Sequence, residues 1–364
     1  MIYLAYGILA FFILRFFVAA TNLVFSPVLK KRKHSGNPLI SVLIPARNEE
    51  KNIPFILEDL KNQSYKNIEV IVFNDQSSDD TAEIVRRFAA ADNRFRLINS
   101  MGLPPGWLGK NNACHQLALQ AAGNFLLFVD ADVRVKSGII ESGLAQMQKH
   151  HLKLLTIFPK QIMKTTGEKI VVPLMNSILL SLLPLILTRV SKRPSLAAGN
   201  GQFMFFEKNS YFELLPHEKV KQNPVEDIFI ARLYKKQKKK MQCMTGNETI
   251  SCRMYRGLHE SIAGLSRSLP HFFGGNFLVA FLYWLITTFG IFIIAFYLPF
   301  VYFTVTMIII IATKTAISIS SRQPVIQNIL WGIVQQLFMG VIVILSYTNK
   351  LLKKSQWKGR NIDS

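Results

Sequence analysis

Three long stretches of the 364-residue chain carry almost no charge. Arg15 is the only charged residue between Ile2 and Phe25, and there is none in the 36 residues 277–312 or in the 23 residues 325–347. About 20 helical residues are enough to cross the roughly 30 Å of hydrocarbon in a bilayer. The sequence therefore predicts a chain anchored in a membrane near both ends, and it excludes an ordinary soluble enzyme.

Basic residues beside these stretches predict how the chain is oriented. The cluster 30–33 follows the first stretch, and residues 350–360 contain five Lys and Arg. Lys and Arg close to a membrane crossing stay in the cytoplasm. We therefore expect a multi-pass protein of the cell membrane with a cytoplasmic catalytic domain. Its expected parts are an N-terminal anchor (1–29), the domain (30–276), a C-terminal transmembrane region (277–348) and a basic cytoplasmic tail (349–364).

The number of C-terminal crossings has two interpretations. A hairpin in 277–312 broken near Pro299, followed by a crossing over 325–347, would carry the basic tail outside, and 36 residues are slightly short for two crossings. We therefore expect an odd number of crossings in 277–312, with its remainder interfacial or re-entrant.

The net charge of +21 comes from 43 Lys and Arg against 22 Asp and Glu. Nucleic-acid binding would suit such a charge, but basic clusters flanking membrane anchors explain it more economically, so we expect no nucleic-acid partner. The three cysteines, an odd and widely spaced set, argue against a disulfide framework and favour a reducing compartment.

Short apolar runs alternate with helical patterns after the first anchor. Strands are expected at 39–45, 68–73, 95–98 and 125–129, with helices at 49–62 (capped by Asn48), from 79 through 88, and at 111–122. This alternation predicts an α/β domain with a mostly parallel, helix-covered sheet, whose ligands bind at the carboxyl ends of the strands.

Acidic residues follow two of these expected strands. Asp75 comes after the second strand, where it is either a ligand-binding residue or a helix N-cap. Asp130 and Asp132 follow the fourth strand, and two carboxylates so close together repel each other unless a cation or hydrogen-bond donors lie between them, for which a divalent metal site is the natural explanation. The sequence therefore predicts a divalent metal site at an edge of the sheet that Asp75 shares.

Two common phosphate-binding motifs are missing from the sequence. There is no GxGxxG after the first strand and no GxxxxGK[ST], which argues against dinucleotide oxidoreductases and P-loop NTPases. A site that holds a phosphate-bearing ligand through a metal remains. Lys110 lies between the acidic strand ends in the sequence, where it either meets a phosphate or is a solvated surface lysine.

The segment 170–188 has 19 uncharged residues that Pro173 and Pro184 interrupt. A crossing here would place Asp132 and Asp227 on opposite sides of the membrane. Residues 170–190 therefore form either a segment on the membrane surface, where a lipid acceptor enters, or a buried core helix.

Taken together, four sequence elements resemble the family 2 glycosyltransferases of the GT-A fold. The elements are 41–50 (SVLIPARNEE), 73–79 (FNDQSSD), 130–132 (DAD) and 225–227 (VED), and the resemblance covers about residues 38–260. More narrowly, 104–110 (PPGWLGK), 253–255 (RMY) and 357–360 (WKGR) resemble the membrane-anchored branch that includes carotenoid- and hopanoid-associated glycosyltransferases.

The resemblance implies a nucleotide-sugar donor, expected to be a UDP-sugar, and a lipid acceptor in the membrane. It implies that Pro45, Arg47 and Glu49 border the nucleoside and that Asp75 binds the uracil ring. It also implies that Asp132, with Asp130, holds Mg²⁺ or Mn²⁺ against the diphosphate, and that Asp227 is the catalytic base of an inverting transfer. Lys110, Glu226 and Arg253 are expected to bind substrate.

The chain departs from the family pattern at one point. Polymerising members carry a QxxRW motif, which this sequence lacks, so the transfer of a single sugar is favoured. The alternatives are transfer to a polyprenyl phosphate carrier, a lipid-phosphate nucleotidyltransferase, or a non-catalytic membrane subunit that only binds a nucleotide sugar. For Asp227 itself, the first turn of a helix over 228–234 is the competing interpretation, since acids favour that position.

Overall fold

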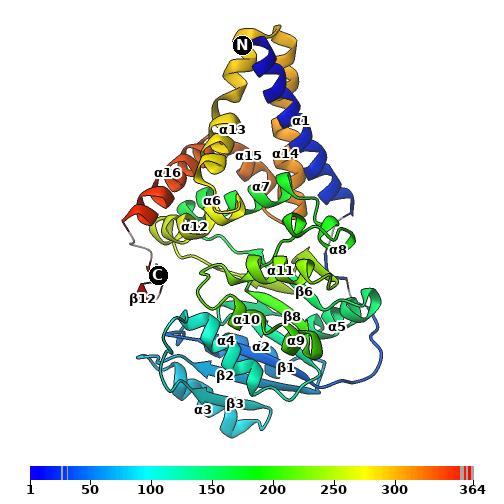
Figure 1. Ribbon diagram of the computed structural model, residues 1–364, viewed down its shortest axis with the longest axis vertical. Coiled ribbons are helices and arrows are strands. Elements are labelled where there is room, and N and C mark those ends of the chain that lie inside the picture. Colours follow the sequence, from blue (N-terminus) through cyan, green and yellow to red (C-terminus); the bar gives the residue numbers. More distant parts are fainter. Residues whose placement is uncertain (26–27, 31, 353–355, 358–359, 362–364) are drawn as a thin grey trace.

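The computed structural model describes residues 1–25, 28–30, 32–352, 356–357 and 360–361. Figure 1 shows an α/β domain at one end of the molecule and a group of long helices at the other, with the N-terminus at the far tip of the helices. The predicted division into membrane anchors and one α/β domain therefore has a counterpart in the shape of the chain.

Seven strands form the central sheet, in the order β3-β2-β1-β4-β8-β6-β9. All pairs are parallel except those that β8 makes with β4 and β6. The predicted mostly parallel sheet is confirmed. The strands are β1 (Ile40–Ala46), β2 (Ile68–Asn74), β3 (Phe95–Asn99), β4 (Phe125–Val129), β6 (Leu154–Phe158), β8 (Phe203–Glu207) and β9 (Met241–Thr245).

Apolar side chains cover both faces of this sheet. Val42 and Ile44 of β1 belong to one buried cluster and Leu43 to another, because successive strand residues point to opposite faces. Helices complete the two layers, which is why the strands are apolar throughout. These helices are α2 (Ile53–Lys61), α3 (Thr81–Ala91), α4 (Gly109–Leu119), α5 (Ile139–His150), α9 (Lys208–Leu214), α10 (Pro216–Lys219) and α11 (Glu226–Lys236), with a 3-10 turn at Pro194–Leu196.

A small second sheet lies beside the edge where β4 ends. It joins β5 (Val133–Val135), β10 (Ile250–Cys252) and β7 (Lys160–Gln161), and Cys252 pairs with Val133. A two-stranded ribbon of β11 (Gln356–Trp357) and β12 (Arg360–Asn361) lies near the end of the chain. The small sheet fixes the backbone that follows Asp132.

The helix expected at 49–62 begins later than predicted, at Ile53. The backbone amides of Asn48, Glu49 and Glu50 bond instead to side chains of the loop after β2, namely Ser77, Thr81 and Asp79. Asn48 takes a left-handed conformation with φ of 52°. The loops after β1 and β2 are thereby fastened together at the carboxyl edge of the sheet.

Four helices are long and apolar enough to cross a membrane: α1 (Ile2–Phe25), α13 (Phe277–Tyr297), α14 (Phe300–Ser320) and α16 (Gly332–Leu351). The short α15 (Val325–Leu330) precedes α16. In Figure 1, α1, α13 and α14 run along the long axis of the molecule, whereas α16 slants across it toward the level of the α/β domain.

The premise that 277–312 is slightly short for two crossings is wrong, because the second helix extends beyond residue 312. Helix α13 ends at Tyr297 and α14 runs from Phe300 past Lys314 to Ser320, so each helix is long enough to cross a membrane. The expected odd number of crossings stays a prediction. Lys314 is accommodated in α14 by a hydrogen bond of 3.1 Å from its Nζ to Gln335 Oε1 on α16.

Residues 166–190 form three short helices at the base of the long ones: α6 (Thr166–Val171), α7 (Pro173–Leu182) and α8 (Leu187–Val190). The ten-residue α7 is too short to span a bilayer. Asn22 of α1 binds the chain just after α7, donating to the carbonyls of Leu180 and Leu183 and accepting from the amide of Leu185. This segment therefore packs between the membrane helices and the domain.

Glu168 fastens α6 to the chain before α12 (Leu258–Phe272). Its side chain is fully buried and accepts from Arg253 Nη2 at 2.7 Å and from the Gly257 amide at 3.0 Å. Burial opposes the charge on Glu168, but hydrogen bonds from Arg253, the Lys164 amide and Thr165 outweigh it and lower the pKa to about 2.

We predict that Glu168→Gln destabilises the protein by about 3 kcal/mol at neutral pH, because Arg253 then loses a buried partner. The pKa of Glu168 is lower in the folded state than its ordinary value of 4.5, so this stabilisation is present above pH 4.5 and is lost as the pH falls toward 2. Thermal unfolding in detergent across this pH range measures it. Glu83→Gln, on the exposed surface of α3, is the control, and equal effects of the two substitutions at pH 7 would contradict the prediction.

Candidate functional site

The loops after β1, β2 and β4 meet at one edge of the sheet, as expected for parallel strands. Their side chains line a cavity of about 120 Å³, which we call the inner cavity. It contains every residue predicted from these loops, together with Lys110 from α4: Pro45, Arg47, Glu49, Asp75, Lys110, Asp130 and Asp132.

Asp75 and Arg47 form the part of the inner cavity nearest β2. The Asp75 amide donates to the carbonyl of Ala46 at 2.8 Å, and Arg47 Nη1 donates to the Asp75 carbonyl at 2.8 Å. Asp75 is buried. These two hydrogen bonds hold the Asp75 carboxylate and the Arg47 guanidinium in the wall of the inner cavity.

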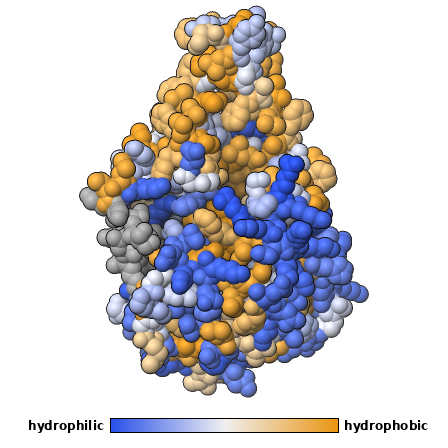
Figure 2. Space-filling model, viewed as in Figure 1, coloured by the Kyte–Doolittle hydropathy of each residue, from blue (hydrophilic) through white to orange (hydrophobic). Residues whose placement is uncertain are grey.

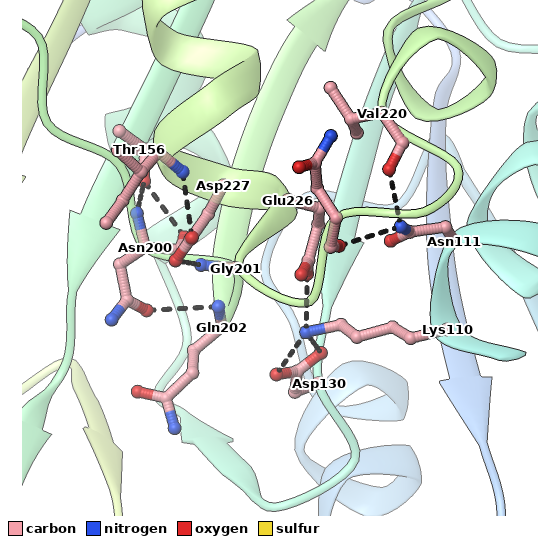
Figure 3. Close-up of polar contacts among 12 residues, drawn as sticks. Lys110, Asn111, Asp130, Thr156, Asn200, Gly201, Gln202, Val220, Glu226 and Asp227 are labelled. Atoms are coloured by element: carbon pink, nitrogen blue, oxygen red, sulfur yellow. Dashed lines mark hydrogen bonds and ion pairs between the residues drawn. The ribbon is translucent and has the colours of Figure 1, made fainter. Parts of the chain in front are cut away.

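Lys110 is not a solvated surface lysine. Its Nζ lies 3.0 Å from an oxygen of Asp130 and 3.0 Å from Glu226 Oε1, so that it joins β4 to the start of α11 (Figure 3). Burial opposes the charge on Lys110, but attraction to Asp130 and Glu226 raises its pKa well above the ordinary value. Lys110 therefore stays charged and is already occupied by two carboxylates.

Asp227 begins α11 and points toward the glycine-containing loop 199–201 (Figure 3). Its Oδ2 accepts from the Gly201 amide at 2.9 Å, and Oδ1 accepts from the amide of Ile228 at 2.8 Å. Burial, followed by repulsion from Glu226, raises the pKa of Asp227 to about 7. A carboxyl with such a pKa can both take and release a proton near neutral pH.

The loop that faces Asp227 was not among the residues predicted from the sequence. A Cβ on Gly201 would lie 2.9 Å from Glu226 Oε1 and 3.0 Å from Lys110 Nζ, and one on Gly199 would lie 2.5 Å from the Asp227 carbonyl oxygen. Asn200 is held by Thr156 of β6 through two hydrogen bonds of 2.9 Å. The sequence Gly199-Asn200-Gly201, just before the apolar strand β8, is the feature from which this loop could have been predicted.

Asp132 has the environment of a cation ligand. Burial, followed by repulsion from Asp130 and Glu49, raises its pKa to about 7, and its Oδ1 has no hydrogen-bond partner within the described part of the chain. The thiol of Cys252 contacts its carboxylate and also receives a bond of 2.8 Å from Gln202 Nε2. A buried carboxyl oxygen without a hydrogen-bond partner, next to two other acidic groups that disfavour its charge, fits a divalent cation, because a cation would favour the ionised form.

Asp130 fits that role less well, because Lys110 already neutralises it. Among the described residues there is no group of three or more His, Cys, Asp or Glu side chains that could hold a metal ion. A cation here would depend on Asp132, and its remaining ligands would have to come from a bound phosphate and from water.

A second and larger cleft, of about 510 Å³, continues from Lys110, Asp130 and Asp132 to Asp227. We call it the long cleft. Its lining includes Glu226 and Trp107, which precedes α4, and also residues of α7 and α12, two helices that pack on the long apolar helices. The long cleft therefore joins the acidic residues of the sheet edge to the base of the apolar helices.

Arg253 lines neither the inner cavity nor the long cleft. It is paired with Glu168 instead. Its sequence neighbours Met254 and Tyr255 do line the long cleft. The ring of Tyr255 lies so close to α12 that a Cβ on Gly264 would come within 2.2 Å of it. The structure thus brings together nine of the ten predicted site residues.

Residues 41–214 match the sequence model described as Glycosyl transferase family 2. This part of the chain is therefore similar to family 2 glycosyltransferases. This match ends before α11, so it does not include Glu226 or Asp227. The GT-A-like fold expected from the sequence is confirmed.

The chain is also similar to named proteins of this kind. It is 28% identical over 250 residues to the 4,4'-diaponeurosporenoate glycosyltransferase of Staphylococcus haemolyticus, covering 66% of this chain and 63% of the relative. It is 27% identical over 254 residues to the protein of that name from Staphylococcus aureus, covering 68% and 64%. The chain thus matches just under two thirds of the length of these relatives.

A solved structure shows the same fold over nearly the whole chain. It is the mannosyltransferase PcManGT from Pyrobaculum calidifontis in complex with GDP-Man and Mn²⁺. The likeness covers 95% of this chain and 99% of that one, with a TM-score of 0.53 and 15% identity.

Proposed function

We propose that this protein is a membrane-bound, inverting, metal-dependent glycosyltransferase that moves a single sugar from a nucleotide sugar, expected to be a UDP-sugar, to a lipid acceptor. The observation that carries the proposal is the long cleft. It holds Asp132 and Asp227 in one space and extends that space to helices that pack on the membrane part. The names of the Staphylococcus relatives, which pair a carotenoid with glycosyl transfer, support a lipid acceptor.

The donor would bind in the inner cavity. Asp75 and Arg47 lie where they can bind the base, and Asp132 is the residue that would hold Mg²⁺ or Mn²⁺. When bound, such an ion stabilises the negative charge that develops on the departing diphosphate. Lys110 adds a fixed positive charge beside the same position, held there by Asp130 and Glu226.

The acceptor would enter along the long cleft and meet Asp227. This carboxylate accepts the proton of the attacking group, and attack from the side opposite the diphosphate inverts the anomeric centre. The Gly201 amide holds the Asp227 side chain in place, and burial tunes its pKa to about 7. Burial raises the pKa of Asp227 more than repulsion from Glu226 does. The proposed base therefore needs to be enclosed in the cleft to keep a pKa of about 7.

We also propose that α1, α13 and α14 cross the membrane while α16 lies obliquely at its inner face. The N-terminal anchor (1–29) and the domain (30–276) keep their predicted roles, with the domain in the cytoplasm. A hairpin of α13 and α14 returns the chain to the inner face, and the slant of α16 leaves the basic tail there (Figure 1). Figure 2 supports this arrangement, since hydrophobic residues dominate the tapered end and hydrophilic ones the domain.

We predict that Asp132→Ala abolishes Mn²⁺-dependent binding of UDP and sugar transfer, because Asp130 is committed to Lys110 and cannot replace it. Isothermal titration with UDP, with and without Mn²⁺, is the measurement. Glu213→Ala, at an exposed ion pair on α9, is the control and keeps both properties. UDP binding that is independent of the metal and equal in the wild type and Asp132→Ala would disprove the metal role.

We predict that Asp227→Asn lowers kcat at least about 100-fold and changes the donor KM little, because the lost interaction is made mainly in the transition state. The wild-type rate should fall as the pH is lowered through about 7, where Asp227 becomes protonated. The variant should lose the part of this pH dependence that comes from Asp227, while any part that comes from Asp132 remains. Steady-state kinetics on reconstituted protein tests both statements, and a variant within a few-fold of the wild type would show that Asp227 is not the base.

The topology is tested by cysteine labelling in intact cells, for which the three native cysteines are suitably buried. We predict that Tyr297→Cys, in the α13–α14 hairpin, reacts with an impermeant reagent, whereas Leu352→Cys reacts only after lysis. Both positions are exposed on the molecule. Equally rapid labelling of the two in intact cells would mean that α16 crosses the membrane.

A further inference from the structure

One surface of the domain, beside the end of α1, carries many positive charges. Four segments that are far apart in the sequence form it, and they contain Lys, Arg and His residues but no Asp or Glu. The segments are residues 32–34, 149–153, 189–193 and 235–240. We call their side chains the basic surface. These side chains come together only in the folded chain.

Contacts between the segments hold the basic surface together. Arg189 of α8 donates from Nη1 to the ring nitrogen Nε2 of His150, at the end of α5, over 2.8 Å. Lys235, near the end of α11, is buried and donates from Nζ to the carbonyl of Ser191 at 2.8 Å. Three of the four segments are therefore fixed side by side.

The environment of His150 shows that residues 32–34 belong to the same surface. Burial, followed by repulsion from Arg189 and Lys149, lowers the pKa of His150. Arg32 adds to this repulsion, although more than a hundred residues separate it from His150 in the sequence. The ring therefore stays neutral near pH 7, where it can accept the hydrogen bond from Arg189.

Acidic residues compensate little of this positive charge. Within the described part of the chain, two lysines of the basic surface pair with glutamates, Lys153 with Glu207 and Lys239 with Glu213. Its other described basic residues, such as the exposed Lys192, form no ion pair with the described Asp and Glu residues. Like charges so close together repel one another, so an anionic partner would lower the energy of this surface.

The basic surface lies where a membrane would meet the domain. Helix α8 lies at the base of α1 in Figure 1, and the flank of the domain that carries α8 and α5 is hydrophilic in Figure 2. Apolar side chains are exposed beside these charges. Val24 and Phe25, at the end of α1, are 77% and 62% exposed, and Val190 of α8 is 62% exposed. Exposed apolar residues next to basic ones are typical of a segment at the level of the lipid headgroups.

We propose that the basic surface binds the anionic headgroups of phospholipids in the cytoplasmic leaflet beside α1. This inference rests on the proposed topology, in which α1 crosses the membrane and the domain lies in the cytoplasm. An acidic protein would match the charges equally well, but a phospholipid also covers the exposed side chains of Phe25 and Val190 with its acyl chains. The domain then has a second attachment to the membrane, separate from both cavities.

Site-specific fluorescence quenching in lipid vesicles tests this inference. Val190→Cys carries the fluorophore in the full-length protein, because this position is exposed and the three native cysteines are buried. The vesicles consist of phosphatidylcholine, to which phosphatidylglycerol or phosphatidylcholine with a nitroxide near the top of one acyl chain is added. At low salt we expect the labelled phosphatidylglycerol to quench at least about fivefold more strongly at equal mole fraction, because several cations attract it. The preference should vanish in about 1 M salt, which screens charges beyond about 3 Å.

Two charge-matched double variants in the labelled protein separate charge from structure. Lys192→Gln combined with Arg193→Gln should lower the preference for phosphatidylglycerol at least about threefold, because two exposed cations of the basic surface are lost. Arg86→Gln combined with Arg87→Gln should keep the preference. These two arginines lie on α3, at the end of the domain farthest from the long helices (Figure 1).

Four results would overturn the inference. They are equal quenching by the two lipids in the protein with the native basic surface, no quenching by either lipid, a preference that the first double variant leaves undiminished, and a loss of quenching by both lipids alike in that variant. No nucleotide sugar enters the test, so each of these results would leave the proposed sugar transfer standing.

Discussion

Lys110 supplies the interaction on which the two halves of the site depend. Its ammonium group lies between Asp130, at the end of the central strand β4, and Glu226, at the start of α11. Without a cation at this point, two buried carboxylates would face each other across the junction of the inner cavity and the long cleft, at a cost of several kcal/mol. The same contact places Asp227, the next residue of α11, opposite the glycine loop 199–201. One ion-paired lysine thus fixes the distance between the residues proposed to bind the donor and the residue proposed to be the base.

The sheet and its acidic edge could be predicted because their causes are local in the sequence. An apolar run rich in branched residues forms a buried strand wherever it can be covered on both sides, as β1, β2 and β4 show. Parallel strands then bring their carboxyl ends together by geometry alone, which is how Asp75, Asp130 and Asp132 come to line one cavity. The late start of α2 shows the limit of this reasoning, since its first amides bond to a loop some 30 residues away.

The features that could not be predicted depend on contacts between distant parts of the chain. Glu226 is more than a hundred residues from Lys110, and Glu168 is 85 residues from Arg253, and nothing beside either basic residue identifies these partners. For Arg253 this distance matters, because a residue expected to bind substrate instead holds α6 in place through Glu168. Helix α12 carries a helical pattern in its sequence, since Leu258, Ile262, Leu265 and Leu269 recur at helical spacing, but its place beside the long cleft depends on contacts with distant segments. The sequence predicted too short an apolar stretch here because Lys314 is charged, and its hydrogen-bond partner Gln335 lies on another helix, α16.

The position of α12 ties the width of the reaction space to the surrounding bilayer. One wall of the long cleft belongs to the α/β domain, but the other is a helix that is bonded on its back to α16 and packed on α6. Lateral pressure that shifts α16 is therefore transmitted to the wall that faces Asp227. For the proposed function, lipid thickness and composition would then affect the width of the long cleft, just as pH would affect the charge of Asp227.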